Sequence, residues 1–142
     1  MNRVRQLVHA DKVYRMGYTG KNIRVVALDT GVYLHPDIRG NVKLFLDFIA
    51  GKTICYDDNG HGTHVAGIIC GNGRLKGIAP QSQLIMLKVL EKDGGGKTKN
   101  VIRGLEWVIQ HHREQRIRIL NFSVGFLPGA HSEEQRKILE ML

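Results

Sequence analysis

The alternation of apolar, β-branched segments with helical segments is the feature that most constrains the fold of this chain. Segments of strand character occupy residues 23–28, 42–46, 84–90 and 117–125. Segments of helical character occupy residues 61–70, 98–113 and 132–142. Continuous apolar strands that alternate with helices through short connections are typical of a parallel sheet. The sequence therefore predicts an α/β fold, in which helices cover both faces of a parallel β-sheet.

The chain length indicates part of one domain. A chain of 142 residues is long enough to form one hydrophobic core and too short for two ordinary domains. Doubly wound sheets usually contain more than four strands, and the last helical segment runs to the final residue. We therefore expect residues 1–142 to be the N-terminal portion of a single larger domain.

Composition argues against several classes of partner. Lys and Arg number 21 against 13 Asp and Glu, a formal charge of +8, but the basic residues are scattered rather than clustered. We therefore expect a solvated surface and no nucleic-acid partner. No apolar run follows the basic start, so we expect no membrane span and a cytoplasmic location, or secretion if the N-terminus is incomplete.

Two cysteines make no disulfide framework, and Cys70 reads as a small buried hydrophobe.

The stretch 57–70 joins an acidic, glycine-broken loop to an apolar helix that begins at a histidine. Three residues with little or no side chain, Gly62, Ala66 and Gly67, would let this helix lie close to another backbone. The helix is apolar nearly all round, which predicts that it is buried. A polar, titratable group at the mouth of a buried helix is typical of a catalytic site.

Asp29 and His61 form a candidate acid–base pair. Asp29 ends the strand at 23–28, where α/β folds place their functional groups. A carboxylate that accepts a hydrogen bond from one imidazole nitrogen fixes the tautomer and leaves the other nitrogen as a general base. The alternatives are that Asp29 caps a turn and that His61 only closes the helix mouth. The residues alone leave open whether the two side chains touch.

Other motifs in the chain match known ligand sites poorly. His61 and His64 are three residues apart without a glutamate between them, unlike zinc-protease helices, so we expect no metal and a structural role for His64 with local hydrogen-bond partners. Residues 94–98 resemble a phosphate loop, but Glu91 stands where that motif needs glycine. Residues 71–77 have the wrong spacing and context for dinucleotide binding. We therefore predict no nucleotide or metal cofactor.

Three motifs follow one another along the chain: Asp29-Thr30-Gly31, His61-Gly62-Thr63-His64-Val65-Ala66-Gly67 and Asn121-Phe122-Ser123-Val124-Gly125. In this order they resemble the signature blocks of the subtilisin-like serine proteases, the subtilases. The similarity extends from about residue 17 to residue 125. It implies a subtilisin-like three-layer α/β/α fold, here incomplete, and a serine-type endopeptidase that acts by Asp–His–Ser acyl transfer on peptide or protein substrates.

The resemblance also implies roles for individual residues. Asp29 would orient the imidazole and His61 would be the general base. Two backbone edges would hold an extended peptide between them through main-chain hydrogen bonds. These edges consist of Gly94, Gly95 and Gly96 on one side and of Ser123, Val124 and Gly125 on the other.

The chain departs from the family pattern in three ways. The family's oxyanion-hole asparagine and nucleophilic serine occur further along the chain than residue 142, so we expect the fragment alone to be inactive. The loop at residues 71–76 is short where many relatives bind calcium, so we predict no calcium there, and Asp57 and Asp58 read as a solvated acidic loop. Phe126 replaces a usual glycine and would narrow the adjacent pocket. An inactive subtilase-like module that binds peptides is the alternative function.

Overall fold

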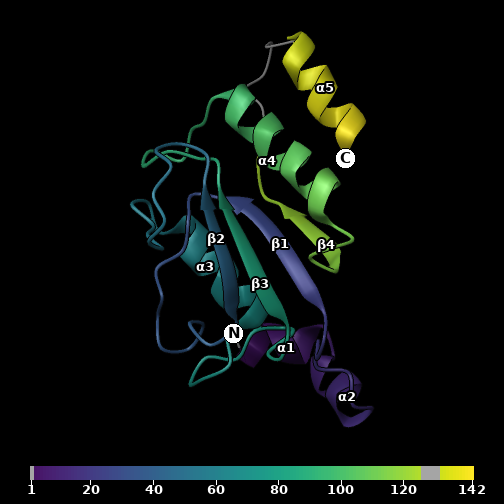
Figure 1. The fold of residues 1–142 in the computed structure, drawn as a ribbon. Helices are drawn as coiled ribbons and strands as arrows, with labels where there is room; N and C mark the ends of the chain where they lie inside the picture. Colours follow the sequence, from purple (N-terminus) through teal and green to yellow (C-terminus); the bar gives the residue numbers. More distant parts are fainter. Residues whose placement is uncertain (1, 126–131) are drawn as a thin grey trace.

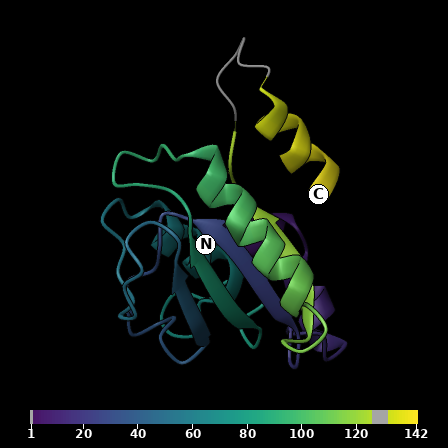
Figure 2. The ribbon, with the colours of Figure 1, turned by 45° about the horizontal axis from the view of Figure 1, so that its top comes forward.

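The computed structural model describes residues 2–125 and 132–142. Its sheet contains four parallel strands in the order β2-β3-β1-β4 (Figure 1). The strands are β1 (Arg24–Asp29), β2 (Val42–Asp47), β3 (Gln83–Lys88) and β4 (Ile117–Phe122). The helices are α1 (Asn2–Leu7), α2 (Ala10–Arg15), α3 (His61–Cys70), α4 (Thr98–His111) and α5 (Glu133–Met141). The predicted parallel α/β fold is confirmed, since α3 lies on one face of the sheet and α4, with α5 beside it, on the other (Figures 1 and 2).

The side chains of β1 alternate between two apolar clusters, one on each face of the sheet. Val25 and Ala27 pack with Ala66 and Cys70 of α3. Val26 and Leu28 belong to the other cluster, which α4 and α5 complete. Because successive residues of a strand point to opposite faces, Asp29 falls in the same row as Val25 and Ala27. The end of β1 therefore directs its carboxylate towards the side of α3.

Helix α3 is less buried than the sequence predicts. Only Gly62, Ala66 and Cys70 are buried, and they form the one row that faces the sheet. A single helix on a sheet buries one face only, and the remaining positions of α3 are half-buried or exposed. A glycine directly after a helix usually predicts a left-handed cap, but Gly71 has a φ of −50°.

The N-terminal segment forms two short helices rather than the single amphipathic helix that its pattern predicts. His9 adopts a left-handed φ of 54° between α1 and α2 and breaks the helical path. The hydroxyl of Tyr14 donates a hydrogen bond of 2.7 Å to the carbonyl of Ile78, which attaches α2 to the turn before β3.

Within the described residues, no helix is both long enough and apolar enough to span a bilayer.

Helix α5 buries one of its apolar side chains completely against the domain. Serine at position 132 and glutamine three residues later predict a capping box. It is present, with the Ser132 side chain accepting from the Gln135 amide and the Gln135 side chain accepting from the Ser132 amide. Ile138 is 0% exposed and belongs to the cluster that contains Leu105 of α4. The next residue, Leu139, is 64% exposed. Docking of α5 against α4 thus depends on Ile138.

We expect Ile138→Ala to lower the free energy of unfolding by about 2–4 kcal/mol, because it removes buried methyl groups and leaves a cavity. Leu139→Ala makes a similar change in composition at an exposed position one residue away and should alter stability by less than about 0.5 kcal/mol. Urea denaturation followed by circular dichroism measures both. Equal effects of the two substitutions would show that α5 does not dock through Ile138.

Candidate active site

The structure brings Asp29 and His61 into contact. Asp29 ends β1 and its side chain is 0% exposed, whereas His61 begins α3 and its side chain is 49% exposed. The Nδ1 atom of His61 lies 2.8 Å from Oδ1 of Asp29. With Nδ1 as donor to the carboxylate, the Nε2 lone pair of the half-exposed ring is available to accept a proton. This arrangement has the geometry of an oriented general base.

The carboxylate of Asp29 is held on one oxygen only. The amide of Thr30 donates to Oδ1 of Asp29 at 2.7 Å, so this oxygen accepts from both Thr30 and His61. The other oxygen, Oδ2, is buried and has no hydrogen-bond partner among residues 2–125 and 132–142. A buried carboxylate with one unsatisfied oxygen is costly and depends on nearby positive charge.

Two glycines let the backbones around this pair touch. A Cβ atom on Gly31, which has a φ of +122°, would lie 2.2 Å from the carbonyl oxygen of Tyr56. A Cβ atom on Gly62 would lie 2.1 Å from the carbonyl oxygen of Gly31. The close approach expected for the small residues of α3 is therefore real at Gly62. Gly67, in contrast, has no neighbouring atom within 4 Å of such a Cβ.

Asp57 joins the end of β1 to the start of α3. Its Oδ1 accepts from the hydroxyl of Thr30 at 2.9 Å and from the amide of Gly60 at 2.9 Å. Its Oδ2 accepts from the amide of Thr63 at 2.8 Å and from the Thr63 hydroxyl. Asp57 thereby caps α3, whose own N-cap Gly60 has no side chain, and an anion is favourable at this end of a helix.

The interpretation of Asp57 and Asp58 as a solvated acidic loop is wrong. Asp57 is partly buried in the network described above, and Asp58 forms an ion pair of 2.7 Å with Lys88. Burial by itself would raise the pKa of the Asp57 carboxyl. The hydrogen bonds from the Thr63 side chain and from the Gly60 and Thr63 amides outweigh burial and hold this pKa below its ordinary value of 3.8.

The two segments expected to hold a peptide line one cavity. All six residues, Gly94, Gly95, Gly96, Ser123, Val124 and Gly125, border a hollow of about 130 Å³. Its apolar lining comes from Leu90, Val101 and Ile138. The side chain of Asn59 donates a 2.9 Å hydrogen bond to the carbonyl of Lys92, which ties the loop before His61 to the loop that contains the three glycines.

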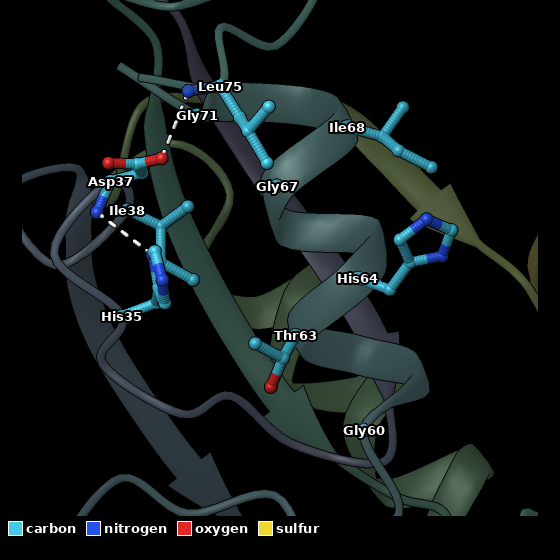
Figure 3. Close-up of a pocket in the computed structure, with 10 residues that line it drawn as sticks. All are labelled: His35, Asp37, Ile38, Gly60, Thr63, His64, Gly67, Ile68, Gly71 and Leu75. Carbon is cyan, nitrogen blue, oxygen red and sulfur yellow. Dashed lines mark hydrogen bonds between the residues drawn. The ribbon is translucent and has the colours of Figure 1, made fainter. Parts of the chain in front are cut away.

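A second hollow runs along the outer face of α3, away from the Asp29–His61 contact. The hollow has a volume of about 330 Å³. Figure 3 shows the residues that line it, among them His35, Ile38 and Leu75 opposite the helix. His64 lines it with an exposed ring and, within the part of the chain that the structure describes, makes no ring hydrogen bond. The prediction that His64 has local hydrogen-bond partners is therefore wrong.

The loop at residues 71–76 is held by a carboxylate of this chain. Asp37 accepts from the Leu75 amide at 3.0 Å and from the Arg74 amide at 3.2 Å. The hydrogen bond from Leu75 is the main cause that lowers the pKa of Asp37. Among the described residues there is no group of three or more His, Cys, Asp or Glu side chains that could hold a metal ion. The absence of calcium from this loop stays a prediction, and Phe126 lies outside the described residues.

The fold and the Asp–His contact together define a chain of the subtilisin-like serine-protease type. The family model of the subtilase family matches residues 20–140, and this chain belongs to that family. It is 42% identical over 127 residues to the serine protease AprX of Bacillus subtilis, and the match covers 82% of this chain and 29% of AprX. It is 36% identical over 121 residues to subtilisin Savinase of Lederbergia lenta, covering 83% of this chain and 43% of that protein.

A solved structure agrees with these relatives. The crystal structure of a cold-adapted subtilisin-like serine proteinase superposes with a TM-score of 0.70 at 30% sequence identity, over 87% of this chain and 44% of that one. The chain thus spans less than half the length of AprX, Savinase and this proteinase. The family resemblance seen in the sequence is confirmed.

The sequence reasoning missed the residues that support the pair. Thr30 and Thr63 both contact Asp57, and Lys88 contacts Asp58. Their signal in the sequence is weak, because threonine and aspartate near a helix start suggest only a cap. The one stronger signal was a single lysine directly after four apolar residues of a strand, Leu84–Leu87.

We expect Asp57→Asn to lower the free energy of unfolding at neutral pH by about 1–2 kcal/mol. Because the folded pKa of Asp57 lies below the unfolded value, its contribution is present above about pH 4 and is lost as the pH falls towards the folded pKa. The variant should therefore lose less stability than the wild type on acidification. Chemical denaturation across this pH range measures the difference.

The control is Glu114→Gln, which removes one negative charge at an exposed position between α4 and β4. It should leave the acid limb of the stability profile unchanged. If Asp57→Asn parallels the wild type at every pH, the carboxylate does not cap α3 in solution.

Proposed function

We propose that this chain supplies the acid–base pair and the peptide-binding edges of a subtilisin-type serine endopeptidase site. The observation that carries this proposal is the 2.8 Å contact between Nδ1 of half-exposed His61 and Oδ1 of buried Asp29. Membership of the subtilase family rests on the match over residues 20–140.

In the proposed reaction His61 moves the proton and Asp29 does not. Nε2 of His61 accepts the hydroxyl proton of a serine as that oxygen attacks the scissile carbonyl, and it later gives the proton to the leaving amine. Asp29 keeps Nδ1 protonated, fixes the ring orientation and stabilises the imidazolium. A carboxylate that is buried and held by two donors suits this role, because it does not swing away when the ring becomes charged.

The three serines of the chain have other roles. Ser82 is buried and donates to the Ala79 carbonyl, and Ser132 caps α5. Ser123 accepts a hydrogen bond from the side chain of Asn121 and borders the peptide cavity. In the family the chain order is Asp, His, Ser. We therefore assign the nucleophile to a Ser block that follows these residues in the parent enzyme, and the 142 residues alone should not hydrolyse peptides.

The glycine and Ser123–Gly125 segments are proposed to bind substrate backbone. Backbone edges offer hydrogen bonds to any extended peptide, and glycines leave room for its side chains. The apolar lining from Leu90, Val101 and Ile138 suits an apolar substrate side chain. This pairing of polar edges with an apolar hollow supports a peptide or protein substrate.

The first test is to sequence the source transcript downstream of codon 142. A reading frame that continues into a Gly-Thr-Ser-type block supports the endopeptidase, and the encoded protein can then be assayed. In that protein we expect Asp29→Asn to lower kcat by about four orders of magnitude, because the imidazole is then held in the wrong tautomer. Asp11→Asn, which alters a half-exposed carboxylate paired with Arg5, is the control and should keep full activity. Unchanged activity of Asp29→Asn would contradict the proposed pair.

Peptide binding by the chain itself is tested at Gly125. A Cβ atom on Gly125 would meet no atom of the described residues within 4 Å, apart from its chain neighbours, yet the residue borders the peptide cavity. We expect Gly125→Val to weaken binding of an extended peptide by about tenfold or more without loss of stability, as measured by calorimetry. Gly40→Val is the matched control, since Gly40 also has open space around it and lies before β2. Equal affinity of the two variants would exclude this cavity as the binding edge.

An inactive module that binds extended peptides is the second candidate. β4 is an edge strand whose Arg118 and Ile119 side chains are exposed, and an unpaired edge can accept a further strand. A stop codon directly after Leu142, together with the peptide affinity described above, would favour this module over an enzyme.

A further inference from the structure

Lys88 is a buried lysine at the end of β3. Its side chain is 1% exposed, and it follows an unbroken buried row from Leu84 to Leu87. The parallel register pairs Lys88 with Asp29 of β1. Among the described residues, these are the two charged residues that are buried. The sheet therefore places its one buried ammonium beside its one buried carboxylate, on the face that α3 covers.

The ammonium of Lys88 uses its three donors on three different segments. It donates to the carbonyl of Thr30 at 2.5 Å, to Oδ1 of Asp58 at 2.7 Å and to the carbonyl of Leu90 at 2.9 Å. A lysine ammonium has three N–H bonds and no acceptor, so all its hydrogen-bonding capacity is used. The ring of Tyr56 lies 5.0 Å from the same nitrogen.

Each of these acceptors belongs to a part of the candidate active site. Thr30 directly follows Asp29, and Asp58 lies three residues before His61. Leu90 begins the loop that contains Gly94, Gly95 and Gly96 and lines the peptide cavity. One nitrogen atom is thus in contact with the segments that hold the acid, the base and one substrate edge.

We propose that Lys88 is a positioning residue of the peptidase site, which sets the relative placement of Asp29, His61 and the glycine edge through these three hydrogen bonds. This inference rests on the proposed function, because it takes the Asp29–His61 site to be a peptidase site. It assigns Lys88 no contact with substrate and no part in proton transfer, because its nitrogen is buried and all three of its donors are in use.

A purely structural role explains the residue less well. Burying an ammonium is expensive, and an apolar side chain of similar size usually packs at least as favourably in a core. The neighbouring positions of β3 are apolar, so a methionine at position 88 would continue the row. The unsatisfied Oδ2 of Asp29 gives the charge a further use, since a buried carboxylate is stabilised by a nearby cation. The position and the charge of Lys88 are therefore better explained by a role in the candidate active site than by core packing.

The test compares Lys88→Met with Met86→Ala in this chain. Met86 is fully buried on the same strand and the same face, two residues earlier, so its truncation destabilises the core without touching the three loops. Long-range proton–nitrogen NMR spectra, recorded where imidazole is neutral, report which ring nitrogen of His61 carries the proton. Calorimetry measures the affinity for an extended peptide, which reports whether the edge formed by Gly94, Gly95 and Gly96 is correctly placed.

We expect Lys88→Met to shift His61 away from the Nδ1-protonated tautomer and to weaken peptide binding by about tenfold or more. Met86→Ala should keep the wild-type tautomer and affinity, although it also lowers the midpoint of thermal unfolding. If the two variants give the same tautomer and the same affinity, Lys88 is a core residue only and the proposal is overturned.

A second variant decides the matter if Lys88→Met does not fold. Asp58→Ala removes one of the three acceptors at a side chain that is 44% exposed, so the core stays intact. It should shift the His61 tautomer partly, and an unchanged tautomer would overturn the proposal. A wild-type chain with the Nδ1-protonated tautomer but without peptide affinity would contradict the proposed function alone, because the placement of Asp29 and His61 by Lys88 is still measured by the tautomer.

Discussion

The alternation of side chains along β1 determines where chemistry can occur in this molecule. Val25, Ala27 and Asp29 point to one face, and two of these three residues anchor the helix that presents His61. A shift of β1 by one residue relative to its neighbours would turn the carboxylate towards α4. The pairing of β1 with β3 over six consecutive positions prevents this shift. The register of the central strands is therefore the condition on which the Asp29–His61 contact depends.

Around this contact, backbone donors and acceptors are satisfied by charged side chains from nearby residues. Asp57 satisfies the amides at the start of α3, and Lys88 satisfies carbonyls at the ends of β1 and β3. Helix starts expose N–H groups and strand ends expose carbonyls, so an anion and a cation are needed side by side. The anion, Asp57, lies four residues before His61 in the sequence, and the cation, Lys88, pairs with Asp29 in the sheet. Stability and the geometry of the site thus rest on the same hydrogen bonds.

Much of this architecture could be predicted from the sequence. The four strands, the two-sided cover of helices and the capping box of α5 follow from periodicity and local hydrogen-bond chemistry, and their bounds agree to within a few residues. Asp29 and His61 stood out because a carboxylate ends a buried strand and a histidine opens an apolar helix. A cytoplasmic location stays a prediction.

Other features could not be predicted, because they depend on contacts between distant segments. The half-exposed outer face of α3 reflects which elements surround it, and periodicity reports only that the helix is apolar. The break at His9 is a backbone conformation without a glycine or proline to announce it. The partners of Asp57 and Asp58 come from β1 and β3, so the two acids were indistinguishable from a solvated loop.

The backbone contact between Gly31 and Gly62 has a consequence for how sequences of this kind can diverge. In most packed pairs a larger residue on one side can be accommodated by a smaller one on the other. Here both partners already lack a side chain, and the atoms in contact are a carbonyl oxygen and a Cα position. No second substitution can relieve the first, so each position is closed to change independently of the other. A larger residue at position 62 would therefore move α3, which carries His61, away from the end of β1, which carries Asp29.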